Sequence, residues 1–217
     1  MMDFARARRM MVDNQLRTAG ITDRRLLAAL SQVPRELFVP AARRPLAYTD
    51  TTHPVGNGRA LGAPAPFARL VQLAAIDGAD HVLDLGCGTG YSAAILAGLA
   101  ESVVAVEPDV ALAAEARATL AELGVANVSV IEGDIETAGK SSGPYDVILI
   151  EGAVPAVPEI LFTQLKPDGR LVALVSLDGR PAVAHLFARS GKGIAARAEF
   201  DAQLPPLARP DADIFVF

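Results

Sequence analysis

Residues 81–91, His-Val-Leu-Asp-Leu-Gly-Cys-Gly-Thr-Gly-Tyr, decide the fold of this chain of 217 residues. The apolar run at 81–85 predicts a buried β-strand, and the residues from 91 to 100 predict a helix after it. Glycines at 86, 88 and 90 permit backbone conformations that a side chain hinders, so they predict a tight turn between the two elements. A buried strand that passes through such a turn into a helix is typical of a parallel α/β sheet.

Strands and helices continue to alternate on both sides of this turn. Further strands are predicted at 103–107, 128–131, 146–150 and 170–176, and helices at 67–75, 109–123 and 159–165. This alternation predicts a mostly parallel sheet with helices on both faces. Residues 194–200 and 214–217 are predicted as strands at the sheet edge, and His185 is predicted to lie in a helix.

Two helices, at 3–16 and 24–31, and a long stretch without regular structure precede the alternating region. The stretch runs from 40 to 66 and contains five prolines. A connection of that length in a compact domain is usually either functional or disordered. Its rigid prolines favour an ordered loop.

The composition favours a globular chain and excludes several classes of protein. Apolar residues make up 51%, charged residues 21%, and the net charge is −5, which disfavours nucleic acid as a partner. The basic residues near the N-terminus are interpreted as a solvated helix face. No apolar run reaches about 18 residues, so no membrane span is expected. The single cysteine and the absence of a recognisable signal peptide predict a cytoplasmic protein.

Acidic residues lie at the ends of three successive predicted strands: Asp84, Glu107 and Asp134. The carboxyl ends of parallel strands meet at one sheet edge, where ligands bind. A carboxylate beside the glycine turn repels phosphates and attracts a cation, and the G-x-G-x-G spacing differs from the dinucleotide pattern. The set therefore indicates a cationic nucleoside ligand, with Glu107 at the ribose hydroxyls and Asp134 at the adenine amino group.

Cysteine and histidine do not suggest a nucleophile or a metal site. Cys87 has no base within its motif and is interpreted as a small residue packed in the turn. His53, His81 and His185 are scattered without metal-ligand spacing, so no metal is expected.

Several further stretches resemble the protein-L-isoaspartate O-methyltransferase family. Met11–Arg17 and Val33–Pro40 are similar to its N-terminal signatures, and Pro54–Gly58 follows its loop. The turn at Asp84–Tyr91 and the run Asn127–Asp134 are similar to its cofactor motifs, and the resemblance covers about residues 9–176.

The resemblance implies a Rossmann-like class I methyltransferase fold with an N-terminal helical extension. It implies S-adenosyl-L-methionine as methyl donor, S-adenosyl-L-homocysteine as product, and isoaspartyl carboxylates in damaged proteins or peptides as acceptors. We expect one domain, 1–217, comprising N-terminal helices and a substrate-side loop (1–66), a cofactor-binding core (67–176) and a C-terminal sheet edge (177–217). The cofactor-binding residues expected are Asp84, Gly86, Cys87, Gly88, Thr89, Gly90, Glu107, Pro108, Gly133, Asp134, Ile135 and Glu151.

The acceptor side departs from the family pattern. The family serine, whose hydroxyl lies by the acceptor carboxylate, is replaced by Gly62. Glu151 stands where the family has small residues, and its charge would repel an anionic acceptor. Ile135 replaces the family glycine after Asp134, and the family's C-terminal Val-Arg-Phe-Val-Pro-Leu run is not found in the proline-rich region 200–210.

Three hypotheses follow. The chain methylates isoaspartyl carboxylates without the family serine, with Thr51, Thr52 or Arg59 as replacements; or it methylates a different acceptor; or it binds the cofactor without turnover and engages a partner. The first two predict turnover, and the third predicts binding alone. The sequence does not indicate an oligomeric state.

Overall fold

A seven-stranded sheet forms the centre of the computed structural model, which describes residues 3–176, 181–191 and 193–207. The strand order is β5-β4-β3-β6-β7-β8-β9. The strands are β3 (His81–Leu85), β4 (Ser102–Glu107), β5 (Val128–Glu132), β6 (Tyr145–Val154), β7 (Leu165–Val175), β8 (Val183–Ser190) and β9 (Gly193–Asp201).

The five strands from β3 to β7 pair in parallel, and β8 and β9 add antiparallel to β7. From β3 the chain first builds outward through β4 and β5, then returns to place β6 on the other side of β3. The strand order therefore reverses between β3 and β6, and ligands of such sheets bind beyond the carboxyl ends at this point.

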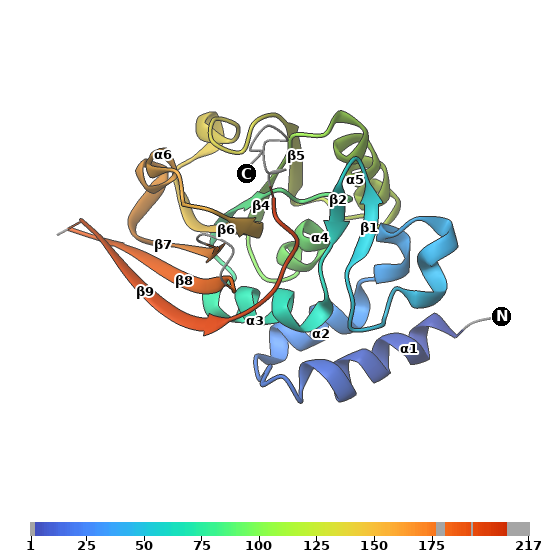
Figure 1. Cartoon of the computed structure of the whole chain (residues 1–217). Coiled ribbons are helices and arrows are strands. Elements are labelled where there is room, and N and C mark those ends of the chain that lie inside the picture. Colours follow the sequence, from blue (N-terminus) through green and yellow to red (C-terminus); the bar gives the residue numbers. More distant parts are fainter. Residues whose placement is uncertain (1–2, 177–180, 192, 208–217) are drawn as a thin grey trace, which may run out of the picture.

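Helices cover both faces, so the predicted fold class is confirmed. They are α1 (Phe4–Met11), α2 (Arg24–Gln32), α3 (Pro64–Ala74), α4 (Tyr91–Ala97), α5 (Val110–Glu122) and α6 (Glu159–Thr163). One core joins the first four helices to one sheet face, whereas α6 packs on the other face. Neighbours on a strand point to opposite faces, so Val82 belongs to the first core and Leu83 to the second. Figure 1 shows α1 and α2 outside α3, as the predicted N-terminal helical extension.

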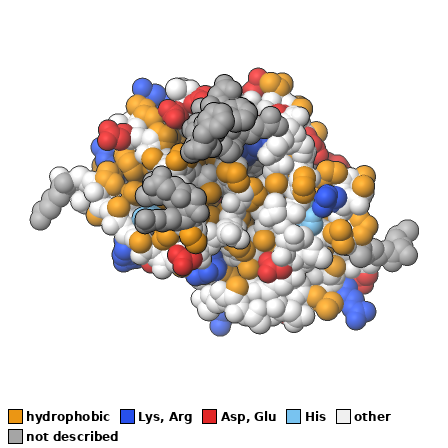
Figure 2. Space-filling model, in the orientation of Figure 1, with side chains coloured by type: hydrophobic (Ala, Val, Ile, Leu, Met, Phe, Trp, Pro, Cys, Tyr) orange, Lys and Arg blue, Asp and Glu red, His pale blue; other side chains and the backbone are white. Residues whose placement is uncertain are grey.

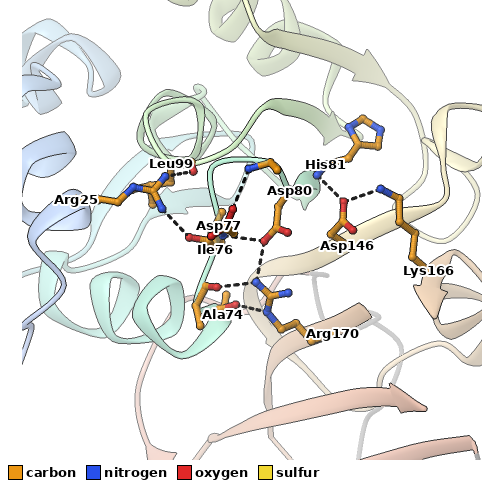
Figure 3. A network of polar contacts seen from close by, with 12 residues as sticks. Arg25, Ala74, Ile76, Asp77, Asp80, His81, Leu99, Asp146, Lys166 and Arg170 are labelled. Atoms are coloured by element: carbon orange, nitrogen blue, oxygen red, sulfur yellow. Dashed lines mark hydrogen bonds and ion pairs between the residues drawn. The ribbon is translucent and has the colours of Figure 1, made fainter. Parts of the chain in front are cut away.

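A polar network ties the amino ends of the strands to α3 and α2 (Figure 3). Arg170 of β7 donates to the Ala75 carbonyl at 2.6 Å and pairs with Asp80 at 2.8 Å. Asp146 accepts from the His81 amide and from Lys166, each at 2.7 Å. This network lies at the amino ends of the strands, so it does not occupy the opposite edge of the sheet, where the carboxyl ends meet and a ligand is expected.

Two sequence-based expectations were wrong in detail. His185 lies in β8, paired with Ala173 of β7, rather than in a helix. The stretch 40–66 is ordered, as expected, but it is not without regular structure: it contains a 3₁₀ helix (Ala41–Leu46) and a hairpin of β1 (His53–Gly56) and β2 (Arg59–Leu61). Strand β9 confirms the edge strand predicted at 194–200; the strand predicted at 214–217 lies outside the described residues.

After β9 the chain crosses the carboxyl ends of the strands. Pro206 bridges to Ala153 of β6: the Ala153 amide donates to the Pro205 carbonyl, and the Leu207 amide donates to the Ala153 carbonyl, both at 3.0 Å. Figure 1 shows this segment beside the β1–β2 hairpin. We call residues 202–207 the crossing segment; it brings a distant part of the chain to the reversal point of the sheet.

Candidate active site

The site forms where β3, β4 and β6 end. Leu85 is paired with Val106 of β4 on one side and with Ile150 of β6 on the other. The next residues, Gly86, Glu107 and Glu151, are therefore brought to one edge from three strands. This juxtaposition unites most of the residues predicted from the sequence.

The glycine turn has the backbone conformations that its sequence predicts. Gly86, Gly88 and Gly90 have φ values of +84°, +56° and +94°, which side chains rarely adopt. A Cβ on Gly90 would lie 3.1 Å from the Ala116 Cβ, so this glycine also lets α5 approach the turn. Nothing lies within 4 Å of a Cβ built on Gly88, which leaves space for a ligand against its backbone.

Glu107 is a fully buried carboxylate that organises the turn. Its Oε2 accepts from the Gly88 amide at 2.7 Å, and its Oε1 accepts from the Asp109 amide at 3.1 Å. Arg59 of β2 reaches the same Oε2 with Nη2, at 3.2 Å. Glu107, the residue predicted to bind the ribose, thus lies buried at the end of β4 and is paired there with a cation.

Asp84 lies beneath the turn without exposed surface. Its Oδ2 accepts from the Ser92 hydroxyl at 2.7 Å, whereas its Oδ1 has no hydrogen-bond partner in the described part of the chain. Burial raises the pKa of this carboxyl group to about 7, against the lowering effect of the Ser92 hydrogen bond; nearby Glu107 raises it further. An unpaired buried carboxylate of this kind favours a cationic ligand.

A small, partly open pocket, called the cavity below, joins the glycine turn to the β1–β2 hairpin. Its lining includes Arg59 and Gly62 from the hairpin side, Gly86–Thr89 from the turn, and Glu151. Burial raises the pKa of Glu151 well above its ordinary value, as does the charge of Asp84. The Glu151 Oε1 is buried and lacks a partner among the described residues, so an acidic group faces the cavity.

Gly62 faces the crossing segment. A Cβ at this position would overlap the Leu204 Cδ2, so Leu204 occupies the space that a side chain would need. The Gly62 carbonyl accepts from Nη2 of the fully buried Arg35 at 2.5 Å. Gly62 therefore stands at the position of the family serine. Arg35 bonds its carbonyl, and Leu204 fills the space beside its Cα.

The remaining predicted residues lie away from the cavity lining. Asp134 is exposed, and its Oδ1 accepts from the Glu136 amide at 2.7 Å. Pro108 is exposed beside Glu107, Ile135 packs against the second core, and the Gly133 amide donates to the Glu107 carbonyl at 3.2 Å. These residues lie at the carboxyl ends of β4 and β5, outside the cavity lining.

Cys87 is buried, and burial raises the pKa of its thiol well above the ordinary value. The raised pKa keeps the sulfur protonated, consistent with a packing role. The described residues contain no group of His, Cys, Asp and Glu that could hold a metal ion. In the same residues, no helix is both long and apolar enough to span a membrane.

Sequence reasoning missed three contributions to the site. Ser92 had a detectable signal, a hydroxyl one residue into the helix after the turn, and it bonds Asp84. Arg59 was considered only as a substitute for the missing serine, and nothing in the local sequence links it to Glu107. Leu204 and Leu207 reach the site through a tertiary crossing that no local pattern reveals.

Comparison with known proteins identifies close relatives. The family model for protein-L-isoaspartate(D-aspartate) O-methyltransferase matches residues 6–202. A protein-L-isoaspartate O-methyltransferase of Koribacter versatilis is 44% identical over 184 residues, which are 85% of this chain and 82% of that protein. One from Roseiflexus castenholzii is 39% identical over 207 residues, 95% of this chain and 94% of the relative.

Solved structures agree with the sequence matches. A protein-L-isoaspartate O-methyltransferase superposes with a TM-score of 0.80 at 26% identity, over 92% of this chain and 65% of the other. The Plasmodium falciparum protein described by the same family name, in complex with S-adenosyl-L-homocysteine, also gives a TM-score of 0.80, at 20% identity, over 93% of this chain and 98% of that chain. The second likeness concerns the fold alone.

Proposed function

Because this chain belongs to the protein-L-isoaspartate(D-aspartate) O-methyltransferase family, we propose that it methylates the α-carboxylate of isoaspartyl residues in peptides and proteins. S-adenosyl-L-methionine is the donor and S-adenosyl-L-homocysteine the product, as the family implies. We further propose that residues 1–217 act as one domain, with the acceptor side in 1–66, the cofactor side in 67–176 and the sheet edge in 177–217.

The observation that carries the proposal is the shared cavity. It is lined by Gly86–Thr89, where the donor is expected, and by Gly62, where the family's acceptor carboxylate lies. A methyl group can pass between two molecules only when both reach one space in line. A cavity that joins the two halves supports transfer rather than cofactor binding alone.

The chain's own residues fit the donor. We propose that Glu107 accepts hydrogen bonds from the ribose hydroxyls of the donor and that Asp84 attracts the ammonium group of its amino-acid end. The space beside Gly88 allows the donor to approach the backbone closely. The unpartnered Asp84 Oδ1 supports this fit. Pro108, Gly133, Asp134 and Ile135 are proposed to hold the adenine, and Cys87, Thr89 and Gly90 to shape the turn.

Transfer to a carboxylate requires no general base, because a carboxyl group with a pKa of about 4 is already ionised at neutral pH. Bound S-adenosyl-L-methionine supplies a methyl group on a positively charged sulfur. The tasks left to the protein are alignment and exclusion of water. We propose that Leu61, Phe67 and Leu204, all in the cavity lining, exclude water from the acceptor oxygen.

Restoring a hydroxyl at position 62 tests whether this cavity receives the acceptor. We expect the double variant Gly62→Ser, Leu204→Ala to raise kcat/KM for an isoaspartyl peptide about 10- to 100-fold, the value of one charge-assisted hydrogen bond. The Leu204 substitution is needed because a side chain at position 62 overlaps Leu204. Steady-state release of S-adenosyl-L-homocysteine measures the rate.

The matched control is Gly62→Ala, Leu204→Ala, which changes the packing equally but adds no hydroxyl. Both variants and the wild type are assayed with the isoaspartyl peptide and with its aspartyl twin. Equal rates for the serine and alanine variants would show that the acceptor carboxylate lies elsewhere. Wild-type turnover on neither peptide, with donor binding retained, would favour another acceptor or a binding module.

A further inference from the structure

The cavity contains an imbalance of charge that an anionic acceptor would have to overcome. Glu151 lines it, and Asp84 and Glu107 lie buried beneath it. Among the described residues that line the cavity, Arg59 is the one with a cationic side chain. A carboxylate entering this space is therefore attracted by Arg59 and repelled by its acidic neighbours whenever they are ionised.

Arg59 is held by cofactor-side groups in this structure. Its Nη1 donates to the Leu207 carbonyl at 2.8 Å, and its Nη2 donates to the Gly86 carbonyl at 2.8 Å and to Glu107 at 3.2 Å. A Cβ built on Gly86 would overlap Leu207 Cδ1 and lie 3.1 Å from Arg59 Nη2. The guanidinium and Leu207 thus lie directly over the first glycine of the turn.

Arg59 and the ribose hydroxyls therefore compete for Glu107. The Oε2 of Glu107 already accepts from the Gly88 amide at 2.7 Å in addition to Arg59. A carboxylate has about four lone-pair sites, and the Gly88 amide, the Asp109 amide and Arg59 take three of them, so a ribose that donates both hydroxyls must displace one. The Arg59 contact, at 3.2 Å, is the longest of the three. The released guanidinium is still a cation and offers its N–H donors to a carboxylate.

We propose that Arg59 is the acceptor-binding residue of this enzyme and that donor binding makes it available. Before the donor binds, it pairs with Glu107 and holds the crossing segment through Leu207. When the ribose takes Glu107, the guanidinium turns within the same cavity to the acceptor carboxylate near Gly62. The inference rests on the proposed function and adds an order to it: donor first, acceptor second.

Among the residues that the structure describes, none other in the cavity lining offers a cationic side chain for this role. Among the residues coloured in Figure 2, basic side chains are scattered over the face and do not gather in one basic patch. Arg35, a second cation near Gly62, is fully buried and donates to the carbonyls of Gly62 and Ala47. It holds the backbone, and the cavity lining does not include it.

Calorimetric titration of Arg59→Gln with two ligands tests the proposal. With S-adenosyl-L-homocysteine alone, we expect the variant to bind about 3- to 10-fold more tightly than the wild type, because the competing guanidinium is gone. With an isoaspartyl peptide, added in the presence of S-adenosyl-L-homocysteine, we expect binding weakened about 10- to 100-fold. A residue that only supports the fold would not shift the two affinities in opposite directions.

Arg44→Gln is the matched control, since it removes the same charge from an exposed position, and thermal unfolding verifies that both variants fold. The proposal would be overturned if Arg59→Gln bound the peptide as tightly as the wild type does, or if it bound both the peptide and S-adenosyl-L-homocysteine more weakly. A wild type that binds the peptide but does not methylate it would contradict the proposed function, while the binding data would still decide the role of Arg59.

Discussion

Replacing Glu107 with alanine is expected to weaken S-adenosyl-L-homocysteine binding by about 100-fold or more. Two charge-assisted hydrogen bonds to the ribose are lost, each contributing about 1.5–3 kcal/mol. The turn also loses an acceptor, because Glu107 bonds the amides of Gly88 and Asp109. Isothermal titration calorimetry measures the affinity, and Glu107→Gln, which fills the same space, separates loss of charge from collapse of the turn.

Glu132→Ala is the matched control for this result. Glu132 is paired with Glu107 across β4 and β5, but it is exposed and makes none of these contacts. We expect its substitution to leave the affinity within about threefold of the wild type, as is usual for exposed positions. If Glu107→Ala bound the ligand as tightly as the wild type does, the ribose position would be wrong.

The second large effect is a dependence of donor affinity on pH, caused by Asp84. Its pKa of about 7 means that it is mostly protonated below neutral pH, and a cationic ligand end requires the ionised form. We expect the dissociation constant of S-adenosyl-L-homocysteine to rise about tenfold for each pH unit below about 7. Above about pH 7 the constant levels off, because the carboxylate is already ionised.

Two variants assign this dependence to Asp84. Asp84→Asn should bind weakly at all pH values between about 5.5 and 7.5, without the slope. Glu151→Gln should retain the slope, although the charge of Asp84 contributes to the raised pKa of Glu151. A slope that persists in Asp84→Asn would show that another group titrates.

The same pKa implies that Asp84 opposes folding. Its folded-state pKa of about 7 lies above the unfolded value of about 4. As pH rises, Asp84 therefore loses its proton in the unfolded chain at a lower pH than in the folded one. The contribution of this group to the free energy of unfolding falls between about pH 4 and pH 7. Asp84→Asn should raise the free energy of unfolding by about 2–4 kcal/mol at pH 8 and less at pH 5, a cost borne for function.

The centre of the fold was predictable because its strands are buried on both faces. The runs at 81–85 and 103–107 are mostly apolar, with an acidic residue at or near the end of each, and β3 and β4 agree with them within one residue. Their ends bring Asp84, Glu107 and the glycine turn together, since parallel strands share an edge. The chemistry of the donor side therefore follows from local sequence.

The acceptor side was not predictable in the same way. Strands β1 and β2 are only four and three residues long, and prolines and glycines obscure their alternation. The crossing segment reaches Gly62 and Gly86 through residues far away in the sequence. The Arg59–Glu107 pair likewise joins β2 to β4, so it emerges from tertiary structure alone.

The most direct test of the account is mass spectrometry of an isoaspartyl peptide incubated with the wild-type protein and S-adenosyl-L-methionine, beside its aspartyl twin. We expect a methyl ester, or the succinimide that forms from it, on the isoaspartyl peptide alone. An unmodified isoaspartyl peptide, in a sample where calorimetry confirms donor binding, would contradict it.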